Sequence, residues 1–166
     1  MPQQPFLARL VPHTSNTLRV LTARDEEGWF LIGSALKLGT SQSWPVDHPL
    51  RAGISVSVDC ASGRRLSPRF IPGERDEPEL TAHPETSIVF QGRQLPHWDE
   101  VLALLDTRHR LMPSVLYAGW NFLMTAHRVC VIEGNEKPGL GLLQVHGPLV
   151  TDPRTETFYR RCGVFD

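Results

Sequence analysis

The sequence has few cysteines, almost no net charge and no long apolar run. Its 166 residues include three cysteines, Cys60, Cys130 and Cys162, an odd number without close spacing, so we expect no disulfide framework. The 17 basic and 18 acidic residues give a formal net charge of −1, which removes the strong electrostatic signal of a general nucleic-acid binder. No stretch approaches the ~20 apolar residues that cross a bilayer, so we expect no membrane association.

The N-terminus also lacks the features of an export signal. Residues 1–5 read Met-Pro-Gln-Gln-Pro, with neither a basic region nor an apolar core. Together with the scattered cysteines, this predicts a cytoplasmic protein. Lysine is rare as well: Lys37 and Lys137 are the only two among the 17 basic residues. We interpret that excess of arginine as the mark of a GC-rich, bacterial genome.

What is present indicates one globular domain, with a short N-terminal tail over residues 1–6. Hydrophobic residues make up 40% of the chain and charged residues 21%, which is ordinary globular usage. The first half alternates apolar and polar residues as half-buried strands do, and Gly33 inside one run predicts either a β-bulge or a close approach of the backbone to another group. The candidate strands are Thr17–Ala23, Trp29–Leu38, Ile54–Cys60, Arg64–Ile71 and Ser87–Phe90.

Helical spacing appears later in the chain. Over His97–His109 the apolar side chains follow an i, i+3, i+4, i+7 pattern, which predicts an amphipathic helix; they are Trp98, Val101, Leu102 and Leu105. Asp152 followed by Pro153 predicts the start of a C-terminal helix, because Asp is a good N-cap and Pro suits the first helical position.

Three segments in the second half of the chain complete the expected fold. Ser114–His127 fits either a buried helix or a strand pair. Arg128–Glu133 and Leu140–Val145 flank a Gly/Pro/Asn-rich turn and predict a hairpin. Because strands cluster and helices are few, we predict an α+β fold: a mainly antiparallel sheet built from hairpins, with two or three helices packed on one face.

No strong catalytic or cofactor motif is present. The sequence lacks a phosphate-binding P-loop, a dinucleotide fingerprint, a nucleophile elbow and a zinc-protease helix, so we expect no cofactor. None of its seven histidines lies within four residues of another, and no metal site is predicted. Cys130, with His127 and His146, is the candidate catalytic group, because nearby imidazoles could activate its thiol. The alternative is that Cys130 is a small buried hydrophobic residue.

Two further segments are candidate binding sites. Arg64, Arg65 and Arg69 fall on one predicted hairpin, with Arg65 and Arg69 on the same face; they could grip phosphate or an acidic partner, or simply keep an edge strand solvated.

The second segment is a proline-flanked loop. Trp44, with Asp47 and His48, could anchor an interface there, or the tryptophan could pack over the end of the sheet.

Three functions fit these features. The leading hypothesis is protein–protein recognition, as an adaptor, inhibitor, immunity-type protein or accessory subunit. The second is a small enzyme or ligand-binding domain that uses the Cys/His residues. The third, not favoured, is a nucleic-acid-processing accessory protein that uses the arginine-rich hairpin. The sequence leaves the oligomeric state open.

Overall fold

The computed structural model describes residues 3–10, 16–41, 53–71, 80–90 and 92–165. Within these ranges lie six strands, four α-helices and one short 3-10 helix. Their bounds are α1 Pro5–Leu10, β1 Thr17–Asp25, β2 Gly28–Leu38, β3 Gly53–Val58, β4 Arg65–Ile71, α2 Trp98–Leu111, β5 Tyr117–Met124, β6 Val129–Asn135, α3 Gly141–Gln144, η2 Leu149–Thr151 and α4 Pro153–Arg161.

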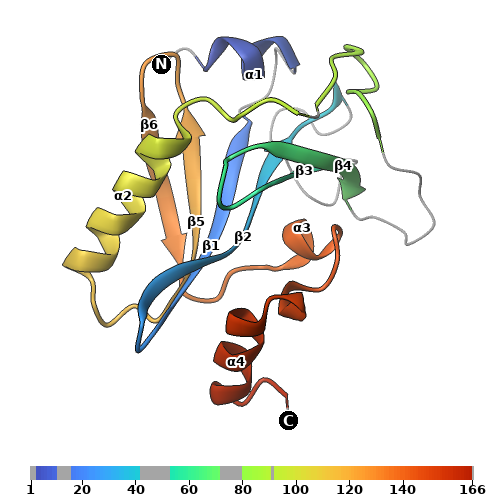
Figure 1. The fold of residues 1–166 in the computed structure, drawn as a ribbon. Helices are drawn as coiled ribbons and strands as arrows, with labels where there is room; N and C mark the ends of the chain where they lie inside the picture. The colour runs from blue at the N-terminus through green and yellow to red at the C-terminus, as the bar shows by residue number, and fades with distance from the viewer. Residues whose placement is uncertain (1–2, 11–15, 42–52, 72–79, 91, 166) are drawn as a thin grey trace.

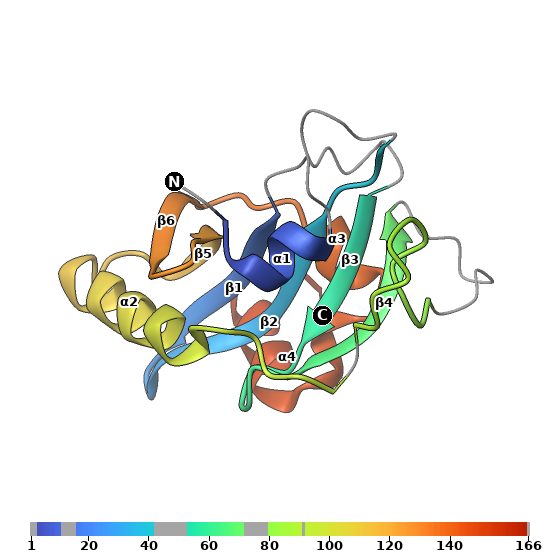
Figure 2. The same ribbon diagram turned by 90° about the horizontal axis from the view of Figure 1, so that it is seen from above.

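The six strands form one sheet in the order β4-β3-β2-β1-β5-β6 (Figure 1), and every neighbouring pair is antiparallel. This confirms the predicted α+β class with an antiparallel sheet. The helices, expected on one face, are distributed over both. The pair α1 and α2 packs on one face with the main core, while α3, η2 and α4 pack on the other (Figure 2).

Strand β1 lies at the centre of the sheet because it is apolar on both sides. Leu18 and Val20 belong to the core under α1 and α2, whereas Leu21 and Ala23 pack toward α3 and α4. As expected for a strand that is covered on both faces, β1 has a run of consecutive buried residues, Val20 to Ala23. The bulge predicted at Gly33 is confirmed: the register between β1 and β2 shifts directly beside this residue.

Both predicted helices are present. In α2, Trp98, Val101 and Leu105 are buried, as their spacing predicts. Helix α4 begins as predicted, with the side chain of Asp152 accepting a hydrogen bond from the backbone N–H of Thr155 at 2.8 Å. The longest helix of the described ranges, α2, has 14 residues, and none of the helices there is long and apolar enough to cross a bilayer.

The predicted hairpin between Arg128–Glu133 and Leu140–Val145 is wrong, because the first segment pairs with a different strand. Strand β6 pairs with β5, so the segment left open between helix and strand is a strand, and Leu140–Val145 contributes the short helix α3 instead. Leu142 and Leu143 of α3 pack against Leu21 and Ala35 of the sheet. A short apolar run fits both the helical and the strand periodicity. Here the segment is helical, and in this form its leucines cover the apolar face of the sheet.

Candidate functional site

A row of polar side chains crosses three neighbouring strands on the face that carries α3. Arg19 of β1 is paired with Asn121 of β5, and Asn121 is paired with Glu133 of β6. Directly paired residues of adjacent strands lie on the same face of a sheet. Sheet formation alone therefore brings a guanidinium, an amide and a carboxylate into one line.

The carboxylate of Glu133 is held between two amides. The Nδ2 atom of Asn121 donates a hydrogen bond to Glu133 Oε1 at 2.6 Å, and Nδ2 of Asn135 donates to the same oxygen at 2.9 Å. All three groups lie near the surface, and Glu133 is exposed. The cluster therefore presents an exposed carboxylate that two amide groups hold in place.

Two glycines permit this arrangement. Gly134 stands between Glu133 and Asn135 and faces the opposite side of the sheet, where a Cβ would lie 2.7 Å from the ring of Trp120. A Cβ on Gly119 would lie 2.7 Å from Nη1 of Arg19. Both distances are closer than real contacts allow, so a side chain at Gly134 would displace Trp120 and one at Gly119 would displace Arg19.

Arg19 supplies the positive charge of the row, and most of its guanidinium group is buried without a partner in the described part of the chain. Its Nε and Nη1 atoms are buried and have no hydrogen-bond partner among the described residues. Burial lowers the pKa of the guanidinium, and the negative charge of Glu133 opposes that shift. Buried N–H groups without acceptors are unfavourable, so an anionic oxygen placed here would be stabilised.

A second row runs beside the first on the same face. Lys37, Ser55 and Arg69 are paired across β2, β3 and β4. The hydroxyl of Ser55 donates to the backbone oxygen of Leu142 at 2.8 Å, which fixes α3 on the sheet. We call the polar residues of these two rows, with Asn135, the charged face: Arg19, Lys37, Ser55, Arg69, Asn121, Glu133 and Asn135.

The proposed Cys/His group is spread over the molecule. Cys130 is half-buried on β6 at the margin of the charged face, and His127 is exposed in the β5–β6 turn. His146 follows α3, and its Nε2 lies 2.7 Å from the Ser55 hydroxyl on β3. Four strand spacings, roughly 19 Å, separate β6 from β3, so Cys130 and His146 do not form a pair.

The arginine hairpin differs from its prediction. Arg65 and Arg69 were expected on one face, but a bulge between β3 and β4 places them on opposite faces. Arg69 is part of the charged face. Arg65 is buried on the α1 side, with its guanidinium 3.9 Å from the ring centroid of Phe6. Arg64 is exposed, so the three arginines do not form one surface for an acidic or nucleic-acid partner.

The remaining predicted binding residues, Trp44, Asp47 and His48, lie outside the described residues. The site residues that sequence reasoning missed are Arg19, Asn121, Glu133 and Asn135. Their signal is the alternation Glu133-Gly134-Asn135, which on a strand places two polar side chains on one face. This signal was missed because the strand was expected to end at Glu133, with Gly134 and Asn135 in the hairpin turn.

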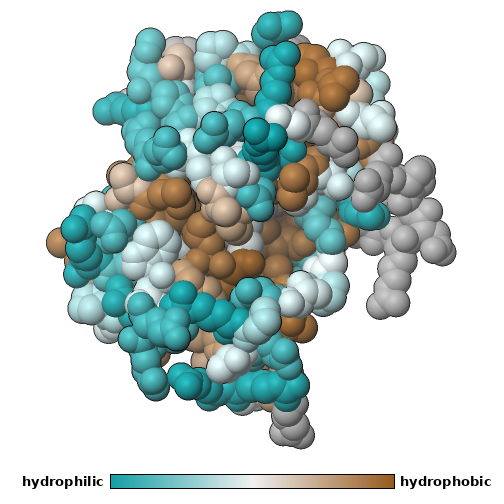
Figure 3. All heavy atoms as spheres, viewed as in Figure 1, coloured by the Kyte–Doolittle hydropathy of each residue, from teal (hydrophilic) through white to brown (hydrophobic). Residues whose placement is uncertain are grey.

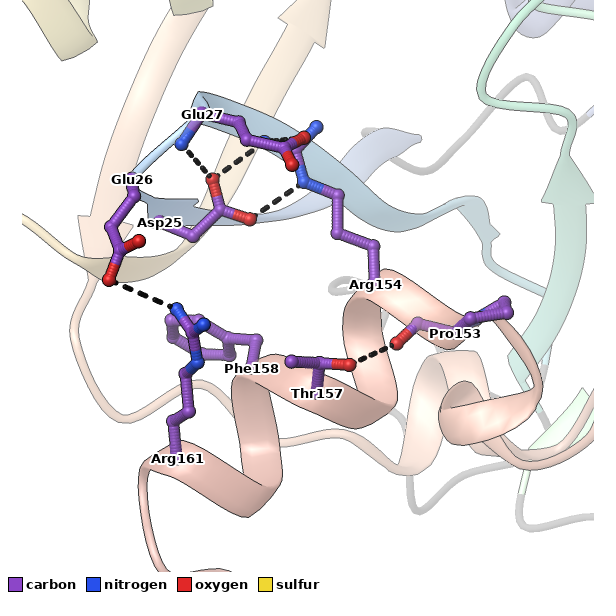
Figure 4. A pocket seen from close by; sticks show the side chains of 8 residues that line it. All are labelled: Asp25, Glu26, Glu27, Pro153, Arg154, Thr157, Phe158 and Arg161. Carbon is purple, nitrogen blue, oxygen red and sulfur yellow. Dashed lines mark hydrogen bonds and ion pairs between the residues drawn. The ribbon is translucent and has the colours of Figure 1, made fainter.

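A separate charged hollow lies between the β1–β2 turn and α4 (Figure 4), with a volume of about 310 Å³. Each of its two arginines is paired with an acidic residue. Arg154 donates two hydrogen bonds to the carboxylate of Asp25, both at 2.7 Å, and Arg161 lies 3.3 Å from Glu26. We interpret this group as a clamp that holds α4 on the sheet, because paired charges leave little for a ligand to bind.

The clamp should make the free energy of unfolding depend on pH. The hydrogen bonds from Arg154 lower the pKa of Asp25 from 3.8 to about 2. A carboxyl with a depressed folded pKa stabilises the fold above its unfolded pKa, and this contribution is lost as the pH falls toward about 2. Asp25→Asn should lower the free energy of unfolding by about 1 kcal/mol at neutral pH.

Urea denaturation of both proteins over a pH series measures this difference, which should vanish near the lowered pKa. Glu27→Gln is the matched control, because Glu27 is 81% exposed and lies 3.9 Å from Arg154. An Asp25→Asn effect that persists undiminished in acid would contradict the clamp.

Exposed hydrophobic side chains bear on the protein-recognition hypothesis. In the view of Figure 1, hydrophobic residues gather near the middle of the molecule, with hydrophilic residues around them (Figure 3). Among the residues that the structure describes, the large exposed hydrophobic ones are Leu66, Val89, Leu111, Leu116, Ile132 and Val164. They come from separate elements and do not by themselves define a docking surface, so protein recognition stays a prediction.

Among the described residues, no three His, Cys, Asp or Glu side chains are placed to hold a metal ion. In a comparison with protein families, the model of the Sugar-transfer associated ATP-grasp family matches residues 1–159. No curated protein and no solved structure matches the chain.

Proposed function

Because the chain belongs to the Sugar-transfer associated ATP-grasp family, we propose that its charged face binds ATP together with Mg²⁺. The observation that carries this proposal is the Arg19 guanidinium, with two buried N–H groups lacking partners in the described chain, one strand away from the Asn121–Glu133 pair. A cation and a carboxylate in one row offer complementary sites for a phosphate chain and its metal ion.

The phosphates of ATP would lie over the basic residues of the charged face. Arg19, Lys37 and Arg69 are contributed by β1, β2 and β4 and share one face. Guanidinium groups bind phosphate oxygens through charge-assisted hydrogen bonds, which are about twice as strong as neutral ones. Arg19 gains most from such contacts, because its buried N–H groups are otherwise unpaired.

The residues around Glu133 fit Mg²⁺. This ion binds proteins through one or two carboxylates and completes its shell with water and substrate phosphates. Glu133 would supply the carboxylate, and the amide nitrogens of Asn121 and Asn135, which both donate to its Oε1, would hold that carboxylate in position. When bound, Mg²⁺ neutralises charge on the phosphates.

Glu133→Gln tests the metal half of the site. Replacing the carboxylate by an amide keeps its size but removes the charge that attracts Mg²⁺. In calorimetric titration with ATP and Mg²⁺, the Kd should rise at least about tenfold, which corresponds to about 1.4 kcal/mol. Glu136→Gln is the control: Glu136 is exposed in the loop just after β6 and should leave the Kd unchanged.

Arg19→Met tests the phosphate half. This variant should weaken ATP binding with and without Mg²⁺, whereas Glu133→Gln should act only when Mg²⁺ is present. Since Arg19 has unpaired buried N–H groups, we expect the melting temperature of Arg19→Met to stay the same or rise. Wild-type affinity in both variants, or absence of ATP binding by the unmodified chain, would refute the proposed function.

A further inference from the structure

Arg65 is a buried arginine that has no acidic partner among the residues that the structure describes. Its side chain is 2% exposed, its Nε donates to the backbone oxygen of Arg93 at 3.1 Å, and its guanidinium stacks on Phe6. Nη1 is buried and has no hydrogen-bond partner among the described residues. A buried charge is normally paired with an opposite one, so this arrangement calls for an explanation.

A pocket lies directly beside this group. It has a volume of about 340 Å³ and is lined by Phe6, Arg9, Ile88, Val89 and Arg93. Phe6 and Arg93, the two residues that contact the Arg65 guanidinium, both line it. We call it the arginine pocket. Phe6 and Arg9 belong to α1, and α1 packs on the face of the sheet that carries the main core. The arginine pocket therefore lies on that face, and the charged face lies on the opposite one.

The charges around the arginine pocket are all positive among the described residues. Its lining holds two arginines and no acidic residue within the described chain, and Arg65 adds a third positive charge behind the wall. Burial and, to a smaller extent, the positive charge of Arg93 lower the pKa of Arg65 to about 10, so Arg65 and Arg93 repel each other. A bound anion would remove both the repulsion and part of the burial penalty.

We propose that the arginine pocket binds the oxyanion group of a small metabolite, a phosphate or a carboxylate. Arg9 and Arg93 would contact the anion, and Arg65 would strengthen the positive potential from behind Phe6. The apolar wall formed by Phe6, Ile88 and Val89 would receive the carbon part of the molecule. The pocket volume is at the lower end of the range for small-molecule sites, which favours a small ligand over a polymer.

The test uses inorganic phosphate and acetate as separate probes on the full chain. Each is titrated while the melting temperature and the heat of binding are recorded. Phosphate should give a saturable stabilisation in the unmodified protein, and Arg93→Gln and Arg9→Gln should each raise its Kd about tenfold or more. Arg110→Gln is the matched control, because Arg110 is 71% exposed, lies on α2 and is paired with Asp106.

Phosphate also resembles part of ATP, so Arg19→Met separates the two sites. Phosphate binding that survives in Arg19→Met and is lost in Arg93→Gln supports the arginine pocket, whether or not the charged face binds ATP. A saturable effect of acetate that exceeds that of phosphate identifies the anion as a carboxylate. Equal phosphate affinity in Arg93→Gln and the unmodified protein, or no saturable effect of either probe, would overturn the proposal.

Discussion

Replacing Gly63 with alanine should lower the free energy of unfolding by about 2–5 kcal/mol, the largest effect that we expect from any single change in this chain. Gly63 has a φ of +67°, a left-handed conformation that is unfavourable for alanine, and its new Cβ would lie 2.3 Å from Cγ of Trp98. Trp98 is 2% exposed in the core under α2, so it cannot move aside without disturbing its neighbours.

The steric part of this effect can be separated from the backbone part. Gly92 also has a positive φ, +83°, but a Cβ there would meet no atom within 4 Å. Gly92→Ala should therefore show only the conformational penalty of about 1–2 kcal/mol. Urea unfolding of both variants measures the difference, and equal midpoints would mean that Trp98 does not pack against Gly63 as described.

Thr22→Val should destabilise the protein by about 2–4 kcal/mol although the two side chains have nearly the same shape. The hydroxyl of Thr22 accepts a hydrogen bond from Nε1 of Trp120 at 2.9 Å and lies 3.1 Å from Nε2 of His109. All three side chains are buried. Valine would leave both nitrogen atoms without a partner in a site that water does not reach, and each such loss is unfavourable by about 1–3 kcal/mol.

Thr107→Val provides the control for the loss of a hydroxyl. Thr107 lies on the exposed side of α2, where its hydroxyl bonds the backbone oxygen of Ala103 at 2.9 Å. Water can replace that bond, so we expect a change well below that of Thr22→Val. Thermal unfolding of the two variants in parallel measures the contrast. Similar losses in both would show that the Thr22 network contributes little.

Much of the fold could be predicted because its signals are local. Strands β1 to β4 alternate or form short hairpins, and α2 carries its apolar residues at helical spacing. Strand β5 gave no clear pattern because it pairs with β1, a partner far away in the sequence, and it mixes Gly119, Trp120 and Asn121 within three positions. Its assignment depends on that distant partner, which no local window contains.

The candidate site was harder to predict for the same reason. Arg19 and Glu133 become neighbours only through Asn121 on the strand between them. Arg65 and Arg69 show a second difficulty: one extra residue in β4 reverses which face a side chain occupies, and nothing in the hairpin sequence marks that bulge. The sequence therefore identifies Arg65 and Arg69 as neighbours on one hairpin, but it does not show which face of the sheet each side chain occupies.

The position of β1 between β2 and β5 also has a kinetic consequence. The β1–β2 contact closes a short turn, while the β1–β5 contact must bring together segments that the whole of β2, β3, β4 and α2 separates. Long loops are slow to close, so we expect docking of the β5–β6 hairpin to be the late step of folding. The proposed ATP site would then be complete only after this late step, because Asn121 and Glu133 lie on β5 and β6. A chain stalled before it would hold the four paired strands β1 to β4 without the carboxylate half of the charged face.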